Sequence, residues 1–172
     1  PLPALTDWLD GQGQPCLGAL TVDLYPEGPV SQASYAPGQD PVQVLQWFDA
    51  GNYQVQVQPR MRNLWIQGGP RARALFAAEP ENAPALNKIP LVNWKRSYAY
   101  VSSTHMLLPR ALNMVYHERG GEKASGCLLH AKFLSTFVEK SAEELNRQQH
   151  YADSHEYKAY HSGLSYGPEF WC

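Results

Sequence analysis

The stretch Gly126-Cys-Leu-Leu-His-Ala-Lys-Phe133 decides the fold, because it predicts a strand that leads directly into the longest amphipathic helix of the chain. Side chains alternate between the two faces of a strand. We therefore expect one face to lie in the core and the other to carry polar groups. The expected core face holds Cys127, Leu129, Ala131 and Phe133, and the other holds Leu128, His130 and Lys132.

His130 is predicted to leave the end of this strand, which is where α/β proteins commonly place ligands. A buried histidine that is hydrogen-bonded to a backbone carbonyl explains the same residue without a ligand. The two interpretations stay open at the level of the sequence.

The residues after Phe133 change to the spacing of a helix. An apolar stripe recurs every three or four positions, and Glu143 stands one turn before Arg147, where the two charges stabilise a helix. The stripe consists of Leu134, Phe137, Val138, Ala142 and Leu145. The following residues, 155–164 and 166–171, are rich in aromatic side chains, so we expect them to pack back on the domain.

The rest of the chain predicts further strands and short helices, and hence an α/β or α+β fold. Helical spacing covers residues 2–10, and a short helix begins at Pro109. Strands are expected at residues 18–25, 63–67, 88–92 and 98–105, with a turn at Gly120-Gly121. Residues 30–62 predict a long loop or insertion with one short helix at residues 41–48, which Asp40 caps and Pro41 begins. Such a loop either binds an acceptor or acts as a lid, or it is an irregular surface insertion.

Length and composition point to a single domain. The 172 residues suffice for one hydrophobic core, and 44% of them are hydrophobic while 17% are charged. The formal net charge is −2, with no run of basic residues. Neither nucleic acid nor an anionic membrane surface is therefore an expected partner.

The three cysteines, Cys16, Cys127 and Cys172, fit neither a disulfide framework nor a structural zinc site, which indicates a reducing compartment such as the cytoplasm. No apolar run is long enough to span a membrane, and the first residues lack the basic and apolar regions that are typical of a signal peptide. The chain begins with Pro1 and enters an amphipathic segment almost at once. We expect it to be the later part of a longer polypeptide.

Several side chains are candidates for a functional site. His105, His130 and Lys132 are predicted at strand ends, and Asp23 lies on a strand. Two histidines and an acidic residue can hold a divalent metal, or they can be unrelated. Arg71 and Arg73 follow Gly68-Gly69-Pro70, and they can bind a phosphate or a carboxylate. The chain has no nucleophile elbow and no His-Glu-x-x-His motif.

A set of motifs along nearly the whole chain resembles the later half of bacterial family 2 glycosyltransferases, a subgroup also similar to family 92 enzymes. The motifs are Leu5-Thr-Asp-Trp-Leu-Asp10, Gly18-Ala-Leu-Thr-Val-Asp-Leu-Tyr25, Trp47-Phe-Asp49, Gly68-Gly-Pro-Arg71, Lys88-Ile-Pro-Leu-Val92, Tyr100-Val-Ser-Ser-Thr-His105, residues 126–133 and Val138-Glu-Lys-Ser-Ala-Glu-Glu144.

The resemblance implies the C-terminal portion of a GT-A fold, a mixed sheet flanked by helices. Such enzymes transfer a sugar from a nucleotide-sugar donor to a carbohydrate acceptor hydroxyl with the help of manganese or magnesium, in polysaccharide biosynthesis. By this resemblance His130 is the expected metal ligand, and His105 is expected to face the donor or the acceptor. Lys132, Arg71 and Arg73 would bind substrate, because the departing diphosphate is negatively charged. Asp23 and Asp49 are alternatives for the carboxylate that deprotonates the acceptor.

The Asp-x-Asp motif of this family is expected in a missing N-terminal half, since the only acid-x-acid triplet here is Glu79-Pro-Glu81. We therefore expect an acceptor-side part, inactive by itself, of a cytoplasmic protein, with peripheral association with the inner membrane as an open alternative. The competing hypothesis is a non-catalytic carbohydrate- or protein-binding module. Its surface would use Trp47, Trp65, Trp94 and the tyrosines.

Overall fold

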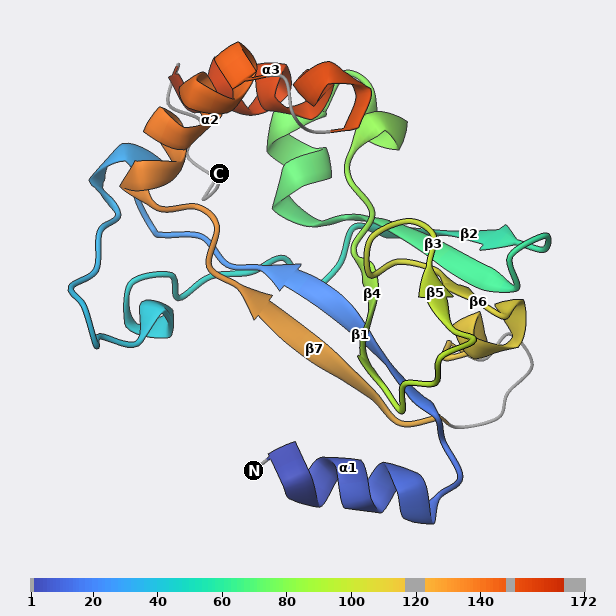
Figure 1. Cartoon of the computed structure of the whole chain (residues 1–172). Helices are drawn as coiled ribbons and strands as arrows, with labels where there is room; N and C mark the ends of the chain where they lie inside the picture. Colours follow the sequence, from blue (N-terminus) through green and yellow to red (C-terminus); the bar gives the residue numbers. More distant parts are fainter. Residues whose placement is uncertain (1, 117–122, 148–150, 166–172) are drawn as a thin grey trace. The chain divides into compact units, whose positions relative to one another are not determined.

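The computed structural model describes residues 2–116, 123–147 and 151–165 (Figure 1). The chain contains two compact units. The first unit comprises Pro1–Thr21, Val55–Ile66 and Ala85–Leu128. The second comprises Val22–Gln54, Gln67–Pro84 and Leu129–Cys172. Each unit has a hydrophobic cluster of its own, and the two are described separately below.

A three-stranded sheet has the strand order β4-β1-β7. Its strands are β4 (Asn87–Val92), β1 (Cys16–Asp23) and β7 (Ser125–His130). Strand β1 is antiparallel to β4, and it runs in the same direction as β7 (Figure 1). The mixed sheet with flanking helices confirms the predicted α/β class.

The pairing of β1 with β4 contains an irregularity between Leu17 and Ala19. The Tyr116 hydroxyl lies at this point: it donates to the Ala19 carbonyl at 2.6 Å and accepts from the Lys88 amide at 3.1 Å. It thus takes up backbone groups that the shifted register would leave unpaired. Gly18 is required here, because a Cβ atom would stand 2.8 Å from Val115 Cγ2.

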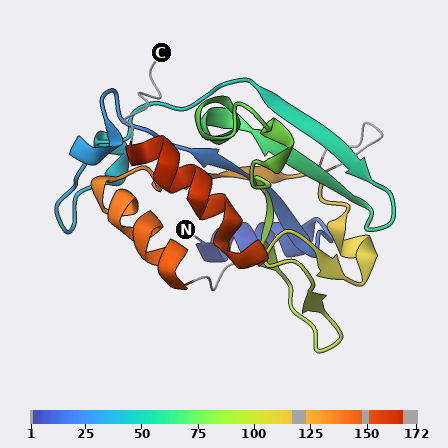
Figure 2. The same cartoon turned by 90° about the horizontal axis from the view of Figure 1, so that it is seen from above.

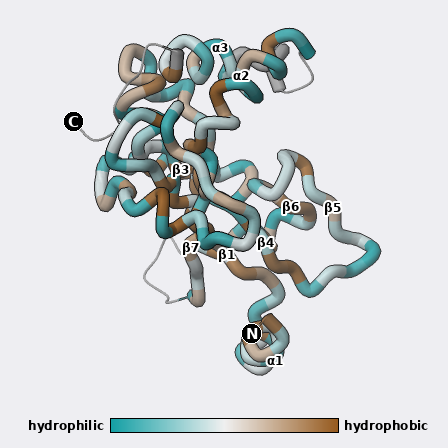
Figure 3. The backbone as a smooth tube through the Cα atoms, turned by 90° about the vertical axis from the view of Figure 1, so that its left-hand side faces the viewer, coloured by the Kyte–Doolittle hydropathy of each residue, from teal (hydrophilic) through white to brown (hydrophobic). Residues whose placement is uncertain are grey.

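The first unit also contains helix α1 (Leu2–Gly11) and the short antiparallel pair β5 (Ala99–Tyr100) and β6 (Leu107–Leu108). Hydrophobic residues recur along β1, β4 and β6 (Figure 3). The buried cluster of this unit consists of Cys16, Ile89, Leu107, Leu112 and Val115. The helix predicted at residues 2–10 and the strand predicted at 88–92 are confirmed.

The predicted strand at residues 98–105 is largely wrong. Only Ala99 and Tyr100 pair as strand, and the chain then turns, with Ser103 at a φ of 47°. The predicted helix after Pro109 is a single 3-10 turn, Arg110–Asn113.

A two-stranded sheet joins β2 (Tyr53–Gln58) to β3 (Asn63–Gly68). Strand β3 confirms the prediction at residues 63–67, but β2 lies inside the region predicted as a long loop. The sequence of β2 does alternate, but its valines alternate with glutamines, and Val55 and Val57 remain exposed. The helix predicted at residues 41–48 is wrong in extent, because only the 3-10 turn Pro41–Gln43 forms, but its expected cap, Asp40, is confirmed.

Helices α2 (Ser135–Arg147) and α3 (Tyr151–Ser165) lie side by side in the second unit (Figure 2). Phe133, Phe137 and Tyr160 form the centre of the buried cluster, and the rings of Phe137 and Tyr160 meet edge-on at 5.3 Å. The predicted helix after Phe133 and its pair Glu143–Arg147 are confirmed. Burial of Tyr157, Tyr160 and Leu164 confirms packing for part of the aromatic tail.

Two expectations, the turn at Gly120-Gly121 and the packing of residues 166–171, fall outside the described residues. None of the helices within the described ranges has the length and apolar character that crossing a membrane requires.

The predicted core face of residues 126–133 is wrong for the strand itself. Cys127 and Leu129 are exposed, Leu129 by 60%, whereas Phe133 is fully buried. The reason is that β7 is an edge strand of its three-stranded sheet and ends at His130. Burial begins only after the strand, where the chain enters the helices.

Candidate functional site

Three residues that are distant in the sequence meet in the second unit. Asp23 ends β1 and His130 ends the neighbouring strand β7, so the shared strand direction brings both side chains to the same edge. The Leu24 amide donates to the His130 carbonyl at 3.1 Å and ties the two strand ends together. Arg71 comes from the π-helical turn Arg71–Leu75 that follows β3.

The Asp23 carboxylate lies between the other two side chains. Its Oδ1 is 2.7 Å from His130 Nδ1, and its Oδ2 accepts from Arg71 Nε at 2.6 Å. The Asp23 side chain is 0% exposed and that of His130 is 42% exposed. One end of the cluster is therefore sealed, and the other reaches solvent.

The charges of this cluster follow from its hydrogen bonds. Burial would raise the pKa of Asp23, but the hydrogen bond with His130 and the charge of Arg71 together outweigh burial and lower that pKa. Burial opposes the charge on Arg71, whereas Tyr160 and Asp23 favour it, and the pKa of Arg71 is raised. Asp23 is therefore ionised and Arg71 is protonated at neutral pH.

An ionised carboxylate only accepts hydrogen bonds, so His130 Nδ1 carries the proton of this contact. In the neutral imidazole the lone pair then lies on Nε2, which has no hydrogen-bond partner among the residues that the structure describes. A carboxylate behind the ring fixes the tautomer and the orientation of the ring. The arrangement suits a metal ligand or a general base.

Lys132 stands two residues beyond His130, but its ammonium group lies against aromatic rings. The Nζ atom is 4.0 Å from the ring centroid of Tyr160, 4.6 Å from that of Phe137 and 5.5 Å from that of Tyr157. Burial, followed by the charge of Arg71, lowers the pKa of Lys132 to about 7. The ring faces favour the ammonium form and oppose this shift.

Arg73, on the same turn as Arg71, holds a second carboxylate. Its Nε and Nη2 donate to the two oxygens of Asp49 at 2.9 and 3.0 Å, and the Tyr25 hydroxyl donates to Asp49 Oδ1 at 2.9 Å. Asp49 is therefore engaged on both oxygens, and its side chain is 10% exposed. The two arginines expected to bind a phosphate or carboxylate each hold a carboxylate of this chain.

The glycine pair before these arginines has a steric reason. Gly68 has a φ of 145°, and a Cβ atom on it would stand 2.1 Å from the backbone oxygen of Asn52. The Gly69 amide donates to that same oxygen at 3.1 Å. This close approach turns the chain from β3 into the helical turn that carries Arg71 and Arg73.

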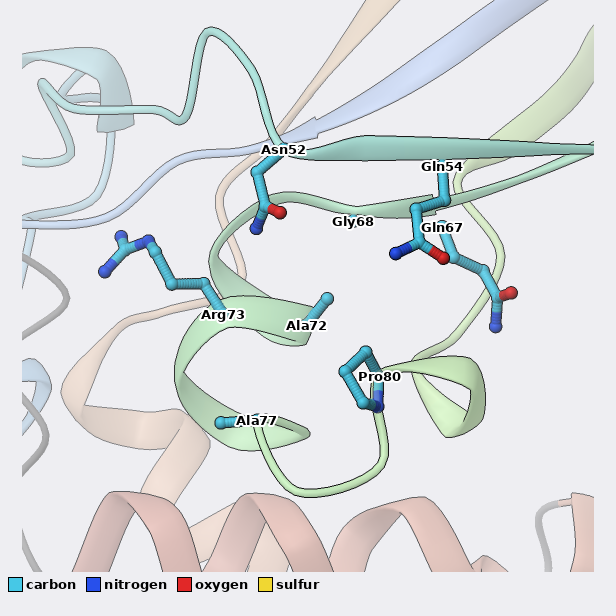
Figure 4. Close-up of a pocket in the computed structure, with 8 residues that line it drawn as sticks. All are labelled: Asn52, Gln54, Gln67, Gly68, Ala72, Arg73, Ala77 and Pro80. Carbon is cyan, nitrogen blue, oxygen red and sulfur yellow. The ribbon is translucent and has the colours of Figure 1, made fainter.

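A cavity of about 310 Å³ lies beside the helical turn Arg71–Leu75 (Figure 4). Asn52 and Gln54 direct their amides into it, whereas Arg73 points away toward Asp49 (Figure 4). Ala72 and Pro80 supply an apolar wall. Paired amides facing an apolar surface suit a neutral, hydroxyl-rich ligand.

His105 belongs to the first unit, whereas His130 belongs to the second. His105 Nδ1 contacts the Asn87 carbonyl at 2.7 Å, and its Nε2 lies 3.0 Å from Lys88 Nζ. The carbonyl requires the proton on Nδ1, so a neutral His105 accepts at Nε2 from the lysine. Its ring also packs on Trp65, with the centroids 5.5 Å apart.

The sequence pattern indicated Asp23, Arg71 and His130 separately but missed their contact. Arg71 stands 48 positions after Asp23, and His130 stands 107 positions after it. Periodicity within a few positions of the sequence cannot reveal contacts between residues that are so far apart. Tyr160, whose hydroxyl accepts from Arg71 at 3.4 Å, was missed as well, because its place in the aromatic tail predicted only packing on the domain.

Comparisons with protein-family models, with curated proteins and with solved structures yield no match to this chain. Within the described residues, no three His, Cys, Asp or Glu side chains form a group that could hold a metal ion.

Proposed function

We propose that this chain is the acceptor-side part of a metal-dependent glycosyltransferase that uses a nucleotide-sugar donor. The observation that carries the proposal is the partly exposed His130, whose outer nitrogen is open and whose inner nitrogen is held by Asp23. The motif resemblance described above supplies the class of reaction. A histidine sealed among apolar neighbours would not support this class.

His130 fits a metal site to which this chain contributes one ligand better than a site formed by this chain alone. His130 Nε2 would be one ligand, oriented by Asp23. The other ligands would be the aspartates of an Asp-x-Asp motif outside this chain. A divalent cation bound there would neutralise charge that develops on the departing diphosphate.

The carboxylates have different roles in this proposal. Both Asp23 oxygens are engaged and the side chain is fully buried, so Asp23 acts through His130 as a positioning residue. Asp49 stays the candidate for the base that deprotonates the acceptor. It would have to give up the hydrogen bond from Tyr25 to do so.

The amide-lined cavity is the proposed acceptor site. Its wall residue Ala72 lies between Arg71, which holds Asp23, and Arg73, which holds Asp49. One turn of the second unit thus connects the proposed metal ligand, the proposed base and the cavity. Arg71, Arg73 and Lys132 were expected to bind substrate directly. In the free chain Arg71 and Arg73 hold carboxylates and Lys132 lies on rings, so direct binding would require these contacts to change.

The test uses the chain extended N-terminally to include the Asp-x-Asp segment. Manganese with UDP-glucose or GDP-mannose is titrated calorimetrically, and His130→Ala is compared with Cys127→Ser, an exposed position on the same strand. We expect metal-dependent binding that His130→Ala weakens at least about tenfold and Cys127→Ser leaves unchanged. Absence of metal-dependent binding in the extended chain would overturn the proposal.

A non-catalytic binding module is the second candidate, and one observation favours it. Trp94, in the first unit, is 53% exposed and yet held in place by neighbouring rings. Nucleotide-sugar binding distinguishes the two candidates, because a module of this kind needs neither metal nor nucleotide.

A further inference from the structure

We propose that a hollow beside Trp94, in the first unit, binds a pyranose ring of a saccharide. The hollow has a volume of about 310 Å³, and it lies between the end of α1 and the end of β4 with its following turn. This volume is at the lower end of the range of small-molecule sites, which begins at about 300 Å³. The proposal does not depend on the glycosyltransferase function.

Trp94 supplies an ordered aromatic platform. Its ring stacks on Tyr100 at a centroid distance of 5.7 Å and an interplanar angle of 29°, and Tyr98 meets it edge-on at 6.2 Å. The Tyr100 hydroxyl donates to the Ile89 carbonyl at 2.7 Å, which ties the stack to β4. Because the indole is already held in place, a ligand that stacks on it pays little further side-chain entropy.

The polar groups of the hollow offer acceptors to a ligand. Asn93 Nδ2 donates to Asp10 Oδ1 at 2.9 Å, and the backbone N–H of Asn93 donates to the Pro15 carbonyl at 2.8 Å. Within the described part of the chain, Asp10 Oδ2 and Asn93 Oδ1 have no hydrogen-bond partner. Both oxygens are thus available to accept from hydroxyl groups.

The lining also limits the chemistry of the ligand. Leu9, Val92 and Trp94 form apolar surface, and the residues that line the hollow include Asp10 but no lysine or arginine. A phosphate or carboxylate would meet a negative charge with no cation to balance it. A pyranose ring has an apolar face for the indole and hydroxyl donors for the two oxygens, so it matches both halves of the lining.

The test is a titration of the whole chain with saccharides, monitored by NMR in the absence of metal and nucleotide. The probes are cellobiose, maltose and N,N′-diacetylchitobiose at millimolar concentrations. For at least one probe we expect saturable shifts of the Trp94 indole and Asn93 side-chain signals. Trp94→Ala should weaken that binding at least about tenfold, and Asp10→Asn at least about threefold.

The matched control is Phe48→Ala, which removes an exposed aromatic ring of the second unit and should leave saccharide binding unchanged. Trp94→Phe keeps an aromatic ring and should retain part of the affinity, and circular dichroism verifies that each variant folds. Saccharide binding should survive His130→Ala, so the outcome is separable from the glycosyltransferase test. No saturable shift with any probe, or equal loss of binding with Phe48→Ala and Trp94→Ala, would overturn the inference.

Discussion

Asp23→Asn is the most informative perturbation of the cluster at the strand ends, because it removes the charge and one acceptor while it keeps the size of the side chain. The carboxylate accepts from Arg71 at 2.6 Å, and both side chains are buried, with exposed fractions of 0% for Asp23 and 7% for Arg71. The variant leaves the guanidinium without a counter-charge. The Tyr160 hydroxyl, at 3.4 Å, stays as a hydrogen-bond partner of the guanidinium.

The expected cost follows from this burial. Removing one partner of a buried ion pair destabilises a protein by about 3–5 kcal/mol, because the remaining charge is uncompensated. His130 adds little to this figure, since its side chain is 42% exposed and solvent screens it. The double variant Asp23→Asn/Arg71→Met removes both charges and should cost at least about 2 kcal/mol less than the sum of the single variants.

The assay is urea denaturation monitored by circular dichroism, at several pH values. Because the pKa of Asp23 is lowered in the folded state, its stabilisation is complete above the unfolded pKa of about 3.9 and is lost as the pH falls through the folded pKa. The difference between the wild type and Asp23→Asn should therefore be constant at neutral pH and narrow below about pH 4.

Asp49→Asn is the control, because Asp49 also pairs with an arginine, Arg73, but this ion pair is more exposed to solvent. The Arg73 side chain is 32% exposed, so we expect a cost of about 1 kcal/mol or less. Equal costs for Asp23→Asn and Asp49→Asn would refute the reasoning from burial. Strictly additive single and double variants at Asp23 and Arg71 would refute the pairing.

Three further predictions concern other parts of the chain. Between about pH 7 and 10 Lys132 is protonated in the unfolded chain but not in the folded one, so the free energy of unfolding should rise with pH. In urea titrations, Lys132→Met should remove that part of the rise. An unchanged slope of the free energy of unfolding against pH would contradict the burial of the amine. Gly68→Ala should lower the free energy of unfolding by more than about 2 kcal/mol, because the new Cβ meets the Asn52 oxygen, whereas Gly11→Ala, where no atom lies within 4 Å, is its control. Iodoacetamide at pH 8, mapped by mass spectrometry, should label the exposed Cys127 well before Cys16, because burial raises the pKa of the Cys16 thiol to about 11; equal rates would contradict this burial.

Local patterns in the sequence were sufficient for several elements and insufficient for their depth of burial. Helix α2 was predictable because its apolar residues recur at helical spacing and Glu143 pairs with Arg147 within one turn. The strand at residues 126–133 was predictable in kind, but its faces were not. Alternation says which side chains share a face, whereas only the strand order shows that β7 lies at the edge and leaves Leu129 exposed.

The sequence by itself determined the class of fold and named Asp23, Arg71 and His130 as candidates one at a time. Only the tertiary structure decided that these three form one cluster, that Arg73 holds Asp49, and that the Lys132 amine lies on aromatic rings. Secondary structure arises from neighbours within a few positions, which periodicity reports. Charge pairing and burial depend on contacts across 24 to 107 positions, and no local pattern encodes them.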